Sequence, residues 1–201
     1  TGFASIYGTK DLVKAVQKEM KKQLKGIASK MIFLTPQLAQ KLANISLKIP
    51  GQLGKNLSTL TVALNKSLEL VQGHPNETTL PLAYWKNKNT QISTPKNPAI
   101  DDCGLIWYAP LVPMRPKAVR DYVEMVKSIT PQYGVEPLIT LTTVNDRLFD
   151  STVPILFDKN DPKGSYKAQV CYLELLEAGK VKGYFPYRVG IGAMETVKKM
   201  H

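Results

Sequence analysis

The chain has 201 residues, of which 43% are hydrophobic and 21% charged, so it can fold around a sizeable core. This composition excludes intrinsic disorder, a collagen-like helix and a disulfide-rich scaffold. The net charge is +11, and the basic excess lies in the first half, because residues 1–100 hold 14 Lys and Arg against 4 Asp and Glu while residues 101–201 hold 13 against 12. No apolar run approaches the ~20 residues that cross a bilayer, so we expect no membrane span.

The first half predicts helices between short strands. We expect strands over residues 1–7, 30–34 and 80–85, and helices over 10–27, 36–47 and 57–72, with the Pro50-Gly51 turn before the last helix. The first helix starts at a Thr9 cap and carries lysines on the face opposite its apolar residues. That face is either a solvated surface or a site for an anionic membrane, nucleic acid or an acidic partner. Residues 86–101 are polar and predict an exposed connection.

The second half predicts strands over residues 103–112, 135–143, 151–158 and 184–190, with helices over 116–132 and 162–180. This β-α-β-β-α-β order is typical of the ferredoxin-like fold. The first half is interpreted as a looser copy of the same unit. We therefore expect an α+β fold in which helices cover an antiparallel sheet, as a single domain over residues 1–201 built from halves of about 1–100 and 101–201.

The motifs that most often mark an active site are missing from the sequence. Cys103 and Cys171 are the only cysteines and match no zinc or redox spacing, so we expect no metal site. Neither a nucleophilic triad nor a glycine-rich loop for phosphates can be assembled. Because the chain opens at Thr1 without a signal segment and stops within a helical pattern, we expect it to be a fragment of a longer protein.

Three polar or aromatic clusters are candidate binding regions. The end of the strand at 135–143 carries Thr142 and Asn145, although an Asn-Asp pair there is also typical of a turn. Tyr187, Arg188 and Gly190 combine a ring, a guanidinium and bare backbone. Arg188 either stabilises negative charge on a ligand or forms a structural ion pair. The third cluster lies at the end of the strand that starts near Gly104 and contains Trp107 and Pro110. Trp107 is either a core residue or a ligand platform.

These clusters also carry a family resemblance. The runs CGLIWYAPLVPMRP at 103–116, EPLITLTTVNDRLFDSTVPILFD at 136–158 and GYFPYRVGIGAM at 183–194, together with IYGT at 6–9 and PLAYW at 81–85, resemble the cap, or substrate, domain of the vanillyl-alcohol oxidase and 4-cresol dehydrogenase (hydroxylating) flavoproteins. The resemblance covers essentially the whole chain. It implies an FAD-binding domain that flanks the cap and is absent from this chain.

The resemblance implies that the parent enzyme transfers hydride from a para-alkylphenol or related alcohol to flavin N5. Carried over by position, Arg188 and Asn145 are the candidate catalytic residues. Thr142, Trp107 and Tyr187 would bind substrate, while Gly190, Arg188 and Pro110 would contact FAD. The family's flavin-linking His falls at Gly190, so the resemblance implies non-covalent FAD, bound mainly by the absent domain.

The resemblance also implies partners: the enzyme's own FAD-binding domain, a small aromatic or alcohol substrate, a second copy in a homodimer and an electron-acceptor protein. The alternative function is a stand-alone basic ferredoxin-like binding module without catalytic activity. Such a module would use nucleic acid as its ligand, yet the sequence lacks the aromatic run of an RNA-recognition sheet, so we expect no nucleic-acid partner.

Overall fold

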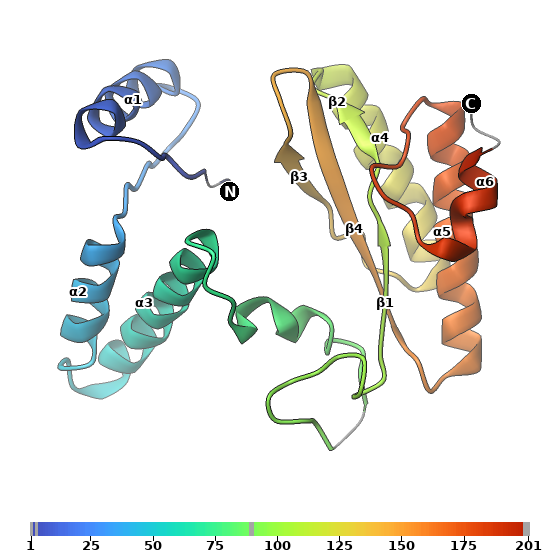
Figure 1. Ribbon diagram of the computed structural model, residues 1–201, viewed down its shortest axis with the longest axis horizontal. Helices are drawn as coiled ribbons and strands as arrows, with labels where there is room; N and C mark the ends of the chain where they lie inside the picture. The colour runs from blue at the N-terminus through green and yellow to red at the C-terminus, as the bar shows by residue number, and fades with distance from the viewer. Residues whose placement is uncertain (1, 3, 89–90, 199–201) are drawn as a thin grey trace. The chain divides into compact units, whose positions relative to one another are not determined.

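In the computed structural model, which describes residues 2, 4–88 and 91–198, the chain forms two compact units, Thr1–Thr79 and Leu80–His201. The first unit contains the helices α1 (Lys10–Gln23), α2 (Pro36–Ser46) and α3 (Gly51–Val71) (Figure 1). The 3₁₀ helix η1 (Glu77–Leu82) leads into the second unit, which holds every strand of the described residues.

Small residues allow α2 and α3 to pack closely as a hairpin. Ala39, Ala43 and Ser46 of α2 are buried, and the Ser46 hydroxyl lies 2.8 Å from that of Thr61 on α3. A side chain at Gly54 would lie 1.8 Å from the backbone oxygen of Ile49, so only glycine fits there. By contrast, α1 begins at the expected Thr9 cap but buries none of its residues.

The second unit is an antiparallel sheet covered on one face by two helices. Its elements are β1 (Cys103–Tyr108), β2 (Leu111–Pro113), α4 (Pro116–Ile129), η2 (Thr130–Tyr133), β3 (Thr140–Thr143), β4 (Leu148–Asp158), α5 (Pro162–Val181), η3 (Ile191–Ala193) and α6 (Met194–Lys198). The central strand β4 pairs with β1 and β2 on one side and with β3 on the other. Helices α4 and α5 lie on the same face of this sheet (Figure 1).

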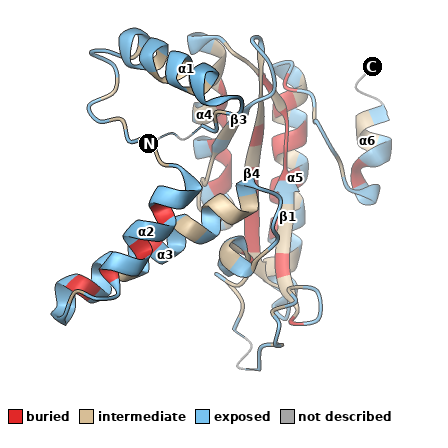
Figure 2. Ribbon diagram, turned by 60° about the vertical axis from the view of Figure 1, so that its left-hand side comes forward, coloured by how far each residue is buried: buried red, intermediate tan, exposed pale blue. Residues whose placement is uncertain are grey.

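The core lies between the sheet and these two helices, where the buried residues of β4 and α5 concentrate (Figure 2). Alternate strand residues point into it: Tyr108, Val153 and Ile155 are completely buried. The buried hydroxyls of Tyr122 on α4 and Ser151 on β4 lie 2.7 Å apart and join helix to sheet. At Gly104 the strands approach so closely that a Cβ atom would lie 2.4 Å from the backbone oxygen of Phe157.

The α+β class and the antiparallel sheet predicted from the sequence are confirmed. The expected strands at 1–7, 30–34 and 80–85 are wrong, because the described residues of these ranges form coil, turns or the 3₁₀ helix η1. The first half is therefore not a second ferredoxin-like copy. Its last helix also begins at Gly51 rather than at residue 57, since Pro50 occupies the N-cap position.

The second half follows the predicted order, but the strand expected over 135–143 is confined to Thr140–Thr143 and the strand expected over 151–158 begins at Leu148. The strand expected over 103–112 is interrupted at Ala109 and Pro110, and the strand expected over 184–190 is reduced to a bridge between Pro110 and Pro186. Two backbone hydrogen bonds, from Leu111 to Phe185 and from Tyr187 to Ala109, each 2.7 Å long, hold this last segment beside β1 and β2. Proline at both bridge positions removes the donors that would extend the pairing.

Candidate functional site

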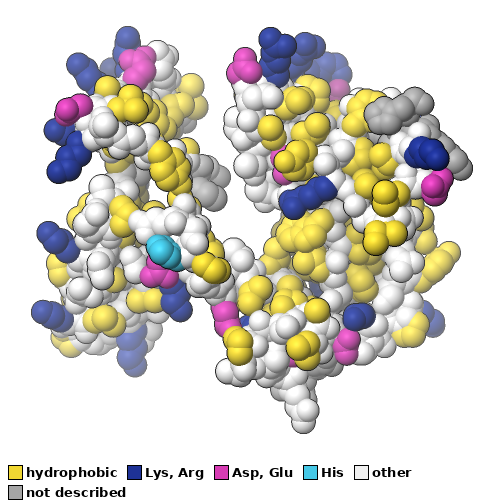
Figure 3. Space-filling view, viewed as in Figure 1, with side chains coloured by type: hydrophobic (Ala, Val, Ile, Leu, Met, Phe, Trp, Pro, Cys, Tyr) yellow, Lys and Arg dark blue, Asp and Glu magenta, His cyan; other side chains and the backbone are white. Residues whose placement is uncertain are grey.

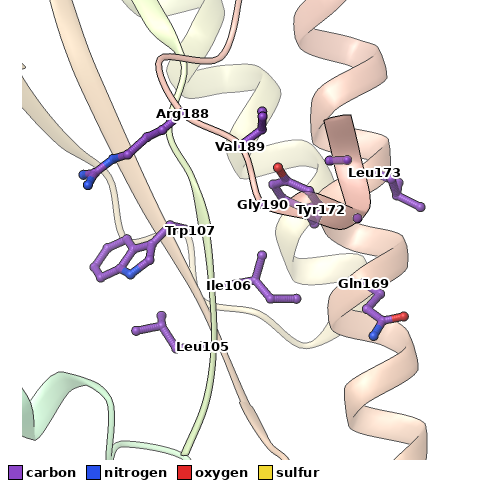
Figure 4. A pocket seen from close by; sticks show the side chains of 11 residues that line it. Leu105, Ile106, Trp107, Gln169, Tyr172, Leu173, Arg188, Val189 and Gly190 are labelled. Carbon is purple, nitrogen blue, oxygen red and sulfur yellow. The ribbon is translucent and has the colours of Figure 1, made fainter. Parts of the chain in front are cut away.

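A pocket of about 610 Å³ lies at the outer edge of β1. It brings together three of the residues singled out in the sequence, Trp107 of β1 and Arg188 and Gly190 of the segment that precedes η3 (Figure 4). The remaining lining residues are Leu105, Ile106, Gln169, Tyr172, Leu173, Val189, Gly192 and Ala193. Most of this lining is apolar, and Arg188 is its only charged side chain.

Strand alternation decides what each pocket residue presents. Ile106 belongs to the face that packs under the helices, whereas the neighbouring Trp107 points to the other face and is 43% exposed. Figure 4 shows Leu105, Trp107 and Arg188 on the side of β1 away from Tyr172 and Gln169 of α5. The indole and the guanidinium therefore share the open face of the sheet.

The electrostatics of the pocket are set by Arg188. Its side chain is exposed and forms no ion pair within residues 2, 4–88 and 91–198, so the structural ion pair weighed in the sequence is not seen there. A guanidinium stays protonated and donates in a planar fork, and an indole offers a flat apolar face. Together they suit a flat ligand that carries or develops negative charge.

Helix α5 closes the other side of the pocket with a hydroxyl group. Tyr172 is mostly buried, and this burial raises the pKa of its phenol. Gln169, Tyr172 and Leu173 were missed in the sequence, although their i, i+3, i+4 spacing places them on one helix face. Their position at a sheet edge could not be read without the strand order.

The other predicted site residues lie outside this pocket. Pro110 is fully buried at the bridge, and Tyr187 beside it is 56% exposed. Thr142 is exposed on β3, at the far side of β4 from β1. Asn145 makes the hairpin turn, where its side-chain oxygen accepts hydrogen bonds from the backbone N–H groups of Arg147 and Leu148, at 2.8 and 3.0 Å.

No group of three His, Cys, Asp or Glu among the described residues is placed to hold a metal ion. Within the same residues, no helix combines the length and the apolar character needed to cross a bilayer. Figure 3 shows hydrophobic side chains gathered on the surface of the sheet-containing unit, with single basic groups between them.

Comparison with known proteins finds relatives in sequence and in fold. No family model matches the chain. It is 27% identical over 196 residues to 1'-carboxy-chondrochloren decarboxylase of Chondromyces crocatus, across 98% of this chain and 36% of that protein. It is 23% identical over 133 residues to the flavoprotein subunit of 4-cresol dehydrogenase (hydroxylating) of Pseudomonas putida, across 66% of this chain and 23% of that subunit.

Solved structures give the same fold. Substrate-bound p-cresol methylhydroxylase matches with a TM-score of 0.67 and 22% identity, across 97% of this chain and 31% of that chain. The 4-ethylphenol oxidase of Gulosibacter chungangensis, in complex with isoeugenol, matches with a TM-score of 0.69 and 19% identity, across 96% and 32%. The chain thus spans about a third of the length of these proteins.

The fold, in which helices cover one face of an open antiparallel sheet, is shared with parts of p-cresol methylhydroxylase and 4-ethylphenol oxidase. The resemblance predicted from the sequence is confirmed: the chain is similar in sequence to the 4-cresol dehydrogenase flavoprotein subunit and in fold to p-cresol methylhydroxylase and 4-ethylphenol oxidase.

The residues of the pocket fit one part of a flavin and not another. Trp107 and the charge of Arg188, which has no ion pair in the described part of the chain, suit a flat ring system that gains electrons. No glycine-rich cradle for a pyrophosphate is present in the sequence. These residues could therefore cover the ring of a flavin whose phosphates are held elsewhere.

Proposed function

We propose that the 201 residues are one cap domain of an FAD-dependent oxidoreductase that takes hydride from a para-alkylphenol or a related alcohol. The observation that carries this proposal is the convergence of Trp107, Arg188 and Gly190 on one pocket, in a chain related to the 4-cresol dehydrogenase flavoprotein subunit. The flavin, when bound, supplies the hydride acceptor at N5. The cap supplies the surface that covers the ring and the substrate.

In this proposal each pocket residue has a physical task. The Trp107 indole packs against a flat ring and excludes water from it. The Arg188 guanidinium donates hydrogen bonds to negative charge that develops during hydride transfer. Tyr187, beside Arg188, and Thr142, on the open face, would contact substrate, and Pro110 would fix the backbone that contacts the cofactor.

Asn145 has a positioning task in the same scheme, because its side chain is engaged by the turn. The turn sets the end of β3, the strand that carries Thr142. We therefore assign Asn145 to the placement of the open-face strand, whereas contact with the reacting atoms is left to Arg188.

We also propose that FAD is held non-covalently, since Gly190 has no nucleophilic side chain that could link it. The full-length parent protein tests this directly through its visible spectrum before and after acid precipitation. Flavin that leaves the pellet agrees with the proposal, and flavin that stays in the pellet contradicts it. In the same preparation, Arg188→Gln should slow anaerobic flavin reduction by about a hundredfold, as the loss of one preorganised donor does, while Arg147→Gln in the hairpin turn serves as the matched control.

A second candidate reaction is oxidative decarboxylation of a carboxylated phenol. The observation that favours it is the match to the decarboxylase across 98% of this chain, against 66% for the 4-cresol dehydrogenase subunit. Release of carbon dioxide from a carboxylated phenol would support decarboxylation, whereas flavin reduction by an alkylphenol would support hydride removal. The FAD-binding domain, a second copy and an electron-acceptor protein are the partners that this proposal implies.

A further inference from the structure

We infer that Asp150 is a substrate-facing carboxylate, which accepts a hydrogen bond from a donor on the ligand and disfavours anionic ligands. The inference rests on the proposed function and deepens it, because it names the chemical class of the substituent that the cap selects. Asp150 lies in the run at 136–158 but is not among the candidate site residues of the sequence analysis.

Strand alternation places this side chain on the open face of the sheet. The next residue, Ser151, is fully buried and bonded to Tyr122 of α4, and Val153 is fully buried in the same core. Successive side chains of a strand point to opposite faces. Asp150 therefore points away from the helices, to the face that Trp107 shares.

The neighbours of Asp150 across the sheet are short or apolar. It lies opposite Leu111 of β2 and opposite Thr142 of β3, and the next pair on this face joins Thr152 to Thr140. Threonine hydroxyls can donate or accept, so this part of the open face offers hydrogen-bonding groups of both kinds. The carboxylate is the only group in this set with a full negative charge.

One oxygen of the carboxylate has no partner within the described chain. Oδ1 of Asp150 is buried and accepts no hydrogen bond from residues 2, 4–88 or 91–198. No ion pair to Asp150 is found in the same residues. A buried acceptor left unpaired costs about 1–3 kcal/mol, and more when it is charged. A donor for this oxygen therefore has to come from outside these residues, and a ligand packed over the open face of the sheet would supply it.

An ionised carboxylate only accepts hydrogen bonds, so it sorts ligands by charge. A phenol with a hydroxymethyl group at the para position can donate to it. A methyl group cannot, and a carboxymethyl group is repelled. Asp150 thus favours hydroxylated para-substituents, which is the opposite of what a carboxylated substrate needs.

The test uses the full-length flavoprotein with its flavin reduced beforehand, so that no ligand is oxidised, and anaerobic calorimetry with three ligands: 4-methylphenol, 4-(hydroxymethyl)phenol and 4-(carboxymethyl)phenol. The variants are Asp150→Asn, which keeps the shape, and Asp150→Leu, which removes both polar atoms. Asp146→Asn is the matched control, because Asp146 is an exposed acid in the adjacent turn. Melting temperatures with and without ligand report whether each variant folds.

We expect Asp150→Leu to weaken 4-(hydroxymethyl)phenol about ten- to hundredfold and 4-methylphenol less than about threefold, as for a hydrogen bond to a charged group. Asp150→Asn should strengthen 4-(carboxymethyl)phenol about tenfold, a gain that a misfolded variant cannot produce. Equal changes for all three ligands, or none, overturn the inference and leave the proposed function intact. A wild-type protein that binds flavin but none of the phenols overturns both.

Discussion

Tyr108 and Gly179 form a packing pair whose coupling can be predicted in sign and size. The Tyr108 hydroxyl is completely buried without a hydrogen-bond partner in the described chain, and burial raises the pKa of this phenol. A Cβ atom at Gly179 of α5 would lie 2.3 Å from that hydroxyl oxygen. The Tyr108 hydroxyl therefore gains no hydrogen bond within the described core, and its oxygen atom requires a glycine at position 179.

The magnitudes follow from these contacts. Tyr108→Phe removes an unpaired buried hydroxyl and should raise the free energy of unfolding by about 1–2 kcal/mol. Gly179→Ala alone should lower it by about 1–2 kcal/mol, because overpacking exceeds the gain in helix propensity. In the Tyr108→Phe background the nearest contacts of the new Cβ become 3.2 Å to the Tyr184 backbone oxygen and 3.6 Å to the ring, so Gly179→Ala should be neutral or stabilising. The coupling energy is then about 2 kcal/mol.

Tryptophan fluorescence in a denaturant titration measures this cycle, because Trp85 and Trp107 both lie in the unit Leu80–His201. Tyr184→Phe is the control with opposite sign: its hydroxyl donates to the Ala118 backbone oxygen at 2.8 Å, so its loss should destabilise by about 1 kcal/mol. The reasoning is refuted if Gly179→Ala is equally destabilising in both backgrounds, or if Tyr108→Phe destabilises the unit.

Three further outcomes are expected. The hydrogen bond from Tyr84 lowers the pKa of Asp101 below its usual value of 3.8, so this carboxylate stabilises the fold above pH 3.8 and the stabilisation is lost as the pH falls through the lower folded-state pKa. Asp101→Asn should therefore flatten the fall in stability at acid pH, and an unchanged fall would contradict this. Gly190→His should change the melting temperature by less than about 2 °C, because a Cβ there meets no atom within 4 Å; a larger drop in calorimetry would show a hidden clash. Tyr122→Phe should destabilise by about 1–3 kcal/mol, because the Ser151 hydroxyl loses its partner, and the additional change Ser151→Ala should restore part of the loss in chemical denaturation.

The sequence predicted the second half of the fold well because its elements carry strong local signals. Helix α5 has Asp161 and Pro162 at its start, and the side chain of Asp161 at the N-cap accepts a hydrogen bond from the backbone N–H of Lys163. The prediction of a strand over 184–190 is wrong because Pro186 lies opposite Pro110, and this pairing of two prolines depends on the tertiary structure.

The first half was predicted less well because short apolar runs are ambiguous. Residues 80–85 form a short apolar run that is typical of a buried strand, yet Pro81 lies inside the 3₁₀ helix η1. The run at 30–34 likewise has no neighbouring strand to pair with among the described residues. A strand needs a partner, and no local pattern reports whether one is available.

The candidate site was predictable in its residue types but not in its grouping. Trp107, Arg188 and Gly190 were noted separately, and only the placement of the last segment beside β1 joins them. The sequence also offered a turn as the role of Asn145, since Asn-Asp pairs favour turns, and its side chain does bond within the hairpin turn. Asp150 carried one weak signal, an acid between Phe149 and Ser151 in an otherwise buried strand.

The most direct test of the central claim is anaerobic titration of the full-length parent with 4-methylphenol, followed at the visible flavin band. The proposed function predicts that the band bleaches with 4-methylphenol or 4-(hydroxymethyl)phenol and stays unchanged with an aliphatic hydroxy acid. A yellow protein that is bleached only by the hydroxy acid would contradict the phenol assignment, and a colourless protein would contradict the assignment to a flavin enzyme.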